Sequence, residues 1–261
     1  MNRMAILMIC LAPAALPQEK TMSCDDGGSR GRDAEQYCEM REVTVPAGGH
    51  LDIDGGTNGG VTVKGSNRND VLVRSKVQTS GEDSAESRRV AGEIRVETSA
   101  GHIHAVGPSM EGHRGWGVSF EILVPQRTDL ELRTHNGGIS ISGVQGHISF
   151  EAVNGGVHLQ QLAGSVEGHT TNGGVHLELA QDHWDGDKCD VSTTNGGVTI
   201  LVPANYSAHL ETGTVNGGVR VGFPVTMQGE INRQIAVDLG SGGRLVRATT
   251  TNGGVTVERS M

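Results

Sequence analysis

Seven copies of the tripeptide Asn-Gly-Gly run through this chain of 261 residues. They begin at Asn58, Asn136, Asn154, Asn172, Asn195, Asn216 and Asn252. The asparagines of the second to fifth copies are 18, 18 and 23 residues apart, and Val or Ile follows each of these copies. A fixed period near 20 residues is typical of repeat proteins, in which each unit stacks on the preceding one.

One repeat unit, Asn154 to Thr171, contains two short alternating runs. Val157 and Leu159 share one face of the first run, and a second run leads to the next Asn-Gly-Gly. Asn and Gly tolerate the positive φ that tight corners need. Because one turn alone cannot bury its apolar face, stacked turns must build the core together. We therefore predict an all-β fold, a β-solenoid (a single-stranded β-helix or flattened roll) with the usual right-handed connections.

Asn-Gly between alternating runs is also the strongest signal for a β-hairpin, so an antiparallel meander is the alternative. A meander does not need the same turn, the same flanking Val and nearly the same length each time, and we favour the solenoid. Its coils would be joined by parallel strands about 4.8 Å apart. Stacked corner asparagines would then form a hydrogen-bonded ladder. We expect this ladder to contain Asn136, Asn154, Asn172, Asn195, Asn216 and Asn252.

Residues 1–15 have the pattern of a secretory signal peptide. Arg3 supplies a positive charge, residues 5–11 are apolar, and residues 12–15 are small or Pro. The apolar run is too short to span a membrane, and no later run is longer. Cys10 follows the bulky Ile9, which disfavours a lipid attachment site. We expect an exported protein of the periplasm or cell surface that is not transmembrane.

The sequence after the signal divides into an arm at 16–42, bounded by cysteines, and a solenoid domain at 43–261. Export favours disulfides, and we expect Cys24 to pair with Cys38 across a polar loop. Cys189 is then left over, either as a buried free thiol, which we favour, or as an intermolecular link. A capping pattern at Ser80 and Asp83 predicts one short helix near 80–91 that covers an end of the solenoid.

The formal net charge of −9, with no cluster of Lys and Arg, argues against nucleic acid as a partner. No Gly-x-Ser-x-Gly elbow or other catalytic constellation appears, so we expect no enzymatic activity and no cofactor. The alternative function is a β-helix enzyme that acts on a polysaccharide. A calcium-stabilised β-roll is a third possibility, although its Gly-Gly-x-Gly-x-Asp nonapeptides are missing.

Two sets of residues are weak candidates for a metal site. His158 and His176 occupy equivalent positions in consecutive repeats and would point outward together. A zinc site needs three or four ligands, and two histidines do not suffice. Asp185 and Asp187 lie in an acidic loop of the kind that calcium favours. We expect a solvated His pair and a solvated loop, with no metal bound.

The long step before Asn195 contains an insertion of five residues, and insertions often lie on the binding face of a repeat protein. His183, Trp184 and Asp185 make this loop a possible binding site. An exposed Trp can be a binding hot spot. It can equally fill a gap where the coil is irregular, and both readings of Trp184 stay open. For Trp116 we favour the gap-filling role.

The Asn-Gly-Gly-Val repeats, the recurring Val-Pro pairs and the Trp184 loop resemble a widespread bacterial family of exported proteins called putative adhesins. The resemblance covers Val43 to Val257. It implies a single-stranded β-helix outside the cytoplasm, no established enzymatic activity and no agreed functional residues. We therefore expect an adhesin-like or scaffolding module that binds an unidentified component of the cell surface or envelope.

Overall fold

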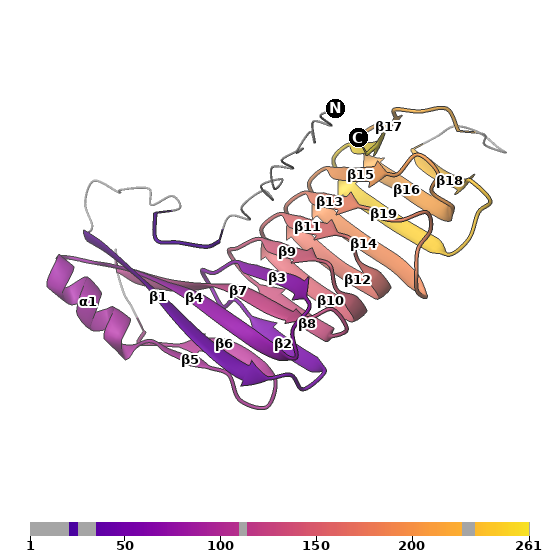
Figure 1. Ribbon diagram of the computed structural model, residues 1–261. Helices are drawn as coiled ribbons and strands as arrows, with labels where there is room; N and C mark the ends of the chain where they lie inside the picture. Colours follow the sequence, from indigo (N-terminus) through magenta and orange to yellow (C-terminus); the bar gives the residue numbers. More distant parts are fainter. Residues whose placement is uncertain (1–20, 26–34, 110–113, 226–232, 261) are drawn as a thin grey trace, which may run out of the picture.

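The computed structural model describes residues 21–25, 35–109, 114–225 and 233–260. Within these residues the chain is all-β with one α-helix, as the sequence predicts, and its strands form two ten-stranded sheets. The strands cross the molecule as a series of steps from the helix end to the C-terminal end (Figure 1). The expected signal peptide at 1–15 lies outside the described residues.

The first sheet, sheet A, is ordered from the helix end of the molecule to the C-terminal end. It consists of β1 (Glu35–Pro46), β4 (Asp70–Gly81), β7 (Gly115–Pro125), β3 (Val61–Ser66), β9 (Ile139–Ser142), β11 (Val157–Gln160), β13 (Val175–Glu178), β15 (Val198–Val202), β20 (Val255–Arg259) and β17 (Val219–Val221).

The second sheet, sheet B, is ordered from the C-terminal end of the molecule to the helix end. It consists of β18 (Gln234–Leu239), β16 (Ala208–Asn216), β19 (Leu245–Asn252), β14 (Lys188–Asn195), β12 (Ala163–Asn172), β10 (Gln145–Asn154), β8 (Asp129–Thr134), β2 (His50–Asp54), β6 (His102–Val106) and β5 (Arg95–Glu97).

The core is the narrow space between the inward faces of the two sheets. Strands alternate between buried and exposed residues, so that Val157 and Leu159 of β11 are fully buried while His158 is exposed. Burying one Val or Leu contributes about 1.5–3 kcal/mol, and one coil supplies only a few such side chains. The stack is therefore stable only because many repeat units, which we call coils, contribute apolar side chains to the same core.

Successive repeats in the middle of the chain pair in parallel and in register. Val157 lies beside Val175, and Asn154 beside Asn172. The same register joins the coil that begins at Asn172 to the one that begins at Asn195. The antiparallel meander is thus wrong for this stretch, because its neighbouring copies would run in opposite directions.

The spatial order of the coils departs from the sequence order at the C-terminal end. β19 and β20, which carry the last repeat, lie between β14 and β16 in sheet B and between β15 and β17 in sheet A. The coil of Asn252 therefore separates those of Asn195 and Asn216. The expectation that each coil stacks on the preceding one is wrong here.

The N-terminal end contains a similar departure. The first coil, β2 and β3, lies beside β8 and β9, although about eighty residues separate them in the sequence. The intervening chain forms β4, α1 (Ser84–Glu93), β5, β6 and β7. Here β1 and β7 are antiparallel to β4, and β1 begins at Glu35, within the expected arm at 16–42.

The helix starts later than the expected range of 80–91, because β4 continues to Gly81. Asp83 caps its N-terminus by accepting a hydrogen bond from the backbone of Glu86, whereas Ser80 lies in the strand. At the other end, the Arg41 guanidinium donates to the carbonyls of Ala91 and Ile94. A cation at a helix C-terminus stabilises the unpaired carbonyls there, so Arg41 fastens α1 to β1.

The corner glycines are required by the close approach of neighbouring backbones, and not by the positive φ that the sequence suggested. None of the corner asparagines has a positive φ. Instead, a Cβ on Gly155 would lie 2.2 Å from the carbonyl oxygen of Gly137 in the adjacent coil, and one on Gly173 would lie 1.9 Å from that of Gly155. The backbones of neighbouring corners are packed so closely that only Gly fits.

Two ladders of polar side chains follow the corners. On the outside, each corner asparagine after the first donates to the side-chain oxygen of the preceding one at 2.8–3.1 Å, in the order Asn58, Asn136, Asn154, Asn172, Asn195, Asn252 and Asn216. On the inside, buried threonines two residues before the asparagines donate to corner carbonyls at 2.7–2.9 Å. These are Thr134, Thr170, Thr193, Thr214 and Thr250.

The cysteines follow the expected pairing. Cys24 and Cys38 form a disulfide, which confirms the prediction. Cys189 is a free thiol with no exposed surface, in β14. Burial, with a smaller effect of Asp190, raises the pKa of the Cys189 thiol far above its ordinary value. The buried reading is correct, and an intermolecular link through Cys189 does not fit this position.

Replacement of Gly155 by Ala tests the packing of the corners. We expect a loss of about 1–3 kcal/mol or more in the free energy of unfolding, because the new methyl group meets backbone that cannot move aside. Gly156→Ala is the matched control, since its Cβ would lie 3.7 Å from the nearest atom. Urea unfolding of both variants measures the difference; equal stabilities would contradict the close approach at the corner.

Replacement of Thr170 by Val tests the inner ladder. The shape is kept, but the carbonyl of Gly155 loses a buried donor, and we expect a cost of about 1–3 kcal/mol. The neighbouring Thr171→Val lies outside the core and should change stability by less than about 0.5 kcal/mol. Thermal unfolding compares the two, and a larger effect at Thr171 would refute the role of the buried hydroxyl.

The Cys189 thiol should be unreactive in the folded protein. Because it is buried and its pKa is raised, little thiolate is available at pH 8, and reagents cannot reach it. In the protein without residues 1–15, which include Cys10, titration with a thiol reagent should therefore detect no free thiol until denaturant is added, and then one. Rapid labelling of the native protein at this position would show that β14 opens readily.

Candidate functional site

The outward side of sheet B concentrates charged and titratable side chains. We call it the histidine face, and define it by the outward residues of β2, β6, β8, β10, β12, β14, β16, β18 and β19. Its carboxylates are Asp52, Asp54, Asp129, Glu131, Glu151, Glu167, Asp190, Glu211 and Asp238. Its cations are Arg133, Lys188 and Arg247, and its histidines are His50, His102, His104, His147, His169 and His209.

The register of the parallel strands aligns these residues in rows across the sheet. Asp52, Glu131, Ser149, Glu167 and Asp190 are direct neighbours on five successive strands. The row continues through Arg247 to Glu211. Because strands in a sheet are about 4.8 Å apart, the row is a nearly continuous line of charge.

A shallow groove crosses this row where the small side chain of Ser149 lies between longer neighbours. One hollow of about 380 Å³ is bounded by Glu131 and Arg133 on one side and by Glu167 and His169 on the other. A second hollow of about 190 Å³ adjoins it and shares its Glu131, Ser149 and Glu167 lining.

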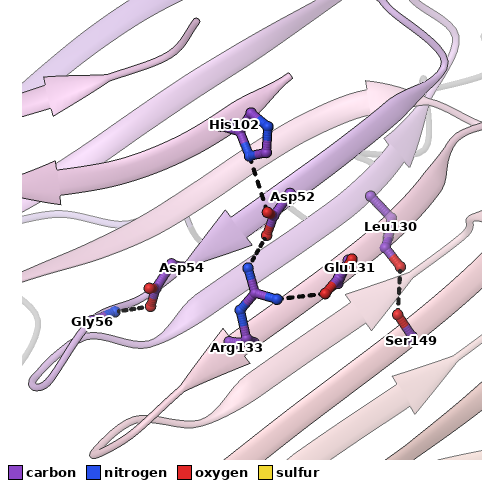
Figure 2. Close-up of polar contacts among 8 residues, drawn as sticks. All are labelled: Asp52, Asp54, Gly56, His102, Leu130, Glu131, Arg133 and Ser149. Atoms are coloured by element: carbon purple, nitrogen blue, oxygen red, sulfur yellow. Dashed lines mark hydrogen bonds and ion pairs between the residues drawn. The ribbon is translucent and has the colours of Figure 1, made fainter. Parts of the chain in front are cut away.

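A chain of polar contacts holds one wall of the groove (Figure 2). The His102 ring contacts Asp52 at 3.0 Å, and Asp52 accepts from Arg133 at 2.7 Å. Arg133 also donates to Glu131. Partial burial opposes the charge of Arg133, but the carboxylates of Asp52 and Glu131 outweigh it and raise the pKa of the guanidinium. The side chains of Arg133 and Glu131 therefore keep a fixed position beside Ser149.

Ion pairs order the other wall in the same way. Lys188 donates to Glu167 at 2.9 Å, and this hydrogen bond raises the pKa of the lysine. Farther along the row, Arg247 lies between Glu211 and Asp190, and its hydrogen bond to Glu211 raises its pKa. Glu151, by contrast, makes no ion pair with any of the described residues, although it lies between Arg133 and His169 on the neighbouring strands. It is an exposed carboxylate at the edge of the groove.

The histidine pair singled out by the sequence lies on the opposite side of the molecule, on sheet A. The rings of His158 and His176 lie with their centroids 5.6 Å apart and their planes tilted by 37°. Their row neighbours are Ser140 and Thr199. In the described part of the chain, no three His, Cys, Asp or Glu side chains are grouped as a metal site requires.

The inserted loop after β13 is fastened to the stack. The amide of Gly164 donates to the carbonyl of Asp185 at 2.7 Å, and Asp187 donates back to Gly164. Trp184 is only 4% exposed, and its indole donates to Gly164 at 3.1 Å. Trp184 thus fills a gap in the core, while the side chains of His183 and Asp185 stay exposed.

Trp116 is partly buried near the helix end, and its indole donates to the carbonyl of Pro108 at 2.8 Å. A hollow of about 350 Å³ beside it is also lined by Cys24, Cys38 and Gln78. Some of its lining residues are close in the sequence to residues 26–34 and 110–113, which are not among the described residues.

Sequence reasoning missed the histidine face, because its histidines are scattered between positions 50 and 209. Each occupies an outward position of a strand, and only the register brings them together. In the described residues no helix has the length and apolar character required to cross a lipid bilayer.

Comparison with solved structures gives distant resemblances. A putative cell adhesion protein from Clostridium sporogenes aligns with 86% of this chain and all of its own, at 10% identity and a TM-score of 0.47. A putative adhesin from Bacteroides fragilis covers 86% of this chain and 97% of its own, at 10% identity and a TM-score of 0.42. No curated protein matches the sequence.

The family assignment rests on the sequence itself. The model of the family described as Toastrack DUF4097 matches residues 42–258. This range includes all seven Asn-Gly-Gly corners and every strand of the histidine face. The chain belongs to the Toastrack DUF4097 family.

Proposed function

We propose that the protein is an exported, non-catalytic β-solenoid module, adhesin-like, that binds a component of the cell surface or envelope through the histidine face. The observation that carries this proposal is the groove at Ser149, with charged walls held by ion pairs on paired strands. A solenoid is supported by the repeat units, because each of them contributes one strand to sheet A and one strand to sheet B in constant register. We expect right-handed turns from the general preference of such connections.

A binding role agrees with the rigidity of the face. Each of its central strands is hydrogen-bonded on both sides, and the corners are fixed by the asparagine and threonine ladders. A surface that is already ordered loses little conformational entropy when it binds. The charged side chains of the walls are also held before any partner arrives.

Export is supported by the disulfide between Cys24 and Cys38, since disulfides persist in oxidising compartments. The pattern of residues 1–15 points the same way. A protein of the periplasm or cell surface would meet envelope components directly, and the histidine face is the most strongly charged sheet surface that it offers them.

A polysaccharide-cleaving enzyme is the alternative, because Glu131 and Glu167 face each other across Ser149. Hydrolysis of a glycosidic bond needs one carboxyl that keeps its proton as a general acid. Both carboxylates are instead engaged in ion pairs, Glu131 with Arg133 and Glu167 with Lys188. This arrangement suits binding better than proton transfer.

Filling the groove tests the proposal. Ser149→Trp should occupy the hollow and reduce binding of the labelled protein to intact cells of its source about tenfold or more. Ser140→Trp is the matched control, since Ser140 is also an outward serine, but on β9 of sheet A. Circular dichroism and thermal unfolding verify that both variants fold.

Binding that survives Ser149→Trp unchanged, or that falls equally with Ser140→Trp, would overturn the assignment of the binding surface. Turnover of an envelope glycan by the purified protein would overturn the non-catalytic role.

A further inference from the structure

The two outer faces of the molecule differ in charge. With histidines neutral, the described residues of the histidine face carry nine carboxylates and three cations, a net charge of −6. The outer face of sheet A is nearly balanced. It carries Glu42, Asp70, Glu121, Glu178 and Glu258 against Lys64, Arg74, Lys76 and Arg220, of which Glu121 and Lys76 are buried. Most of the excess negative charge of the chain therefore lies on one side.

The histidines are unevenly distributed in the same way. Six of the eleven in the chain lie on the histidine face, against two on the outer face of sheet A. Imidazole is the side chain that gains its charge in the mildly acidic range. Protonation of all six would cancel the net charge of the face, from −6 to about zero, while the fold keeps every group in place.

Most of these histidines contact a carboxylate or hydroxyl oxygen. His102 contacts Asp52, His104 contacts Glu97, and His209 contacts Asp238 at 2.7 Å. In the first row of the face, His50 and His147 lie on either side of Asp129. His169 is hydrogen-bonded to Ser192 and Thr194 at the end of the groove.

We propose, building on the function above, that the histidine face binds a Lys- or Arg-rich segment of a protein at neutral pH and releases it on mild acidification. Charge complementarity selects the partner, because a line of carboxylates favours an extended chain of cations. Glu151 and the open groove give such a segment a place to bind without breaking the existing ion pairs. The release follows because each proton that a histidine binds adds a positive charge to the histidine face, and this charge repels the cationic partner.

The probe is a fluorescent deca-lysine peptide, followed by anisotropy with the full-length mature protein at low salt. We expect saturable binding at pH 7.5, about tenfold weaker binding at pH 5.5, and a further loss in 0.5 M salt, which screens exposed charges. Deca-glutamate should not bind. Absence of deca-lysine binding at pH 7.5, or equal affinity at both pH values, would overturn the inference.

Two double variants locate the binding surface. Glu151→Gln with Glu167→Gln removes two charges from the histidine face, and Glu178→Gln with Glu258→Gln removes two from sheet A. The net charge of the two variants is the same. We expect the first to weaken binding about fivefold or more and the second less than twofold. Equal losses would mean that deca-lysine responds to total charge alone, which contradicts a defined surface.

A histidine variant tests the release. His50→Asn, His147→Asn and His169→Asn together should leave affinity at pH 7.5 within about twofold and reduce the loss at pH 5.5 from about tenfold to about threefold. His158→Asn with His176→Asn should leave the full loss. An unchanged response in the triple variant would refute the role of the face histidines. Equal affinity for spermine, at the same amine concentration, would refute an extended chain as the partner.

The outcome is separable from that of the proposed function. If Ser149→Trp abolishes binding to cells but deca-lysine does not bind, the histidine face is the binding surface and the partner is not cationic. If deca-lysine binds the face and Ser149→Trp leaves binding to cells intact, the proposed function fails.

Discussion

The close approach of neighbouring backbones at the corners is the constraint on which the rest of this structure depends. The carbonyl of one corner glycine occupies the space where the Cβ of the next would lie. This contact sets the distance between coils and leaves the corner carbonyls in need of donors. The buried threonines satisfy them from inside, and the asparagines join their side chains outside. Repetition of the same corner therefore gives the same register to every strand that follows it.

A repeated corner explains both what the sequence could predict and what it could not. Spacing and alternation predicted parallel strands, a thin aliphatic core and an asparagine ladder. The inner threonines were missed because Thr in a strand is ordinary; their signal was the recurrence of Thr two residues before Asn. The spatial order was predicted wrongly at the ends, since all corners offer the same surface. The coil of Asn252 fits between those of Asn195 and Asn216 as well as beyond them.

The same register explains why the histidine face could not be found in the sequence. Consecutive repeats drew attention to His158 and His176, which have equivalent positions. The face is instead assembled from strands that do not repeat one another. His50 and His147 come near Asp129 only because β2, β8 and β10 are adjacent. In the inserted loop, Trp184 fills a gap in the core, while His183 and Asp185 are exposed.

The order of the coils is tested most directly by disulfide cross-linking between corners. Cysteines at positions 195 and 252 would lie on neighbouring parallel strands, about 4.8 Å apart, whereas those at 195 and 216 would be separated by two strand spacings. A disulfide needs Cα atoms within about 4.4–6.8 Å. The account predicts that Asn195→Cys with Asn252→Cys cross-links in the folded protein and that Asn195→Cys with Asn216→Cys does not. The reverse result would show that the coils stack in the order of the sequence and would contradict the fold described here.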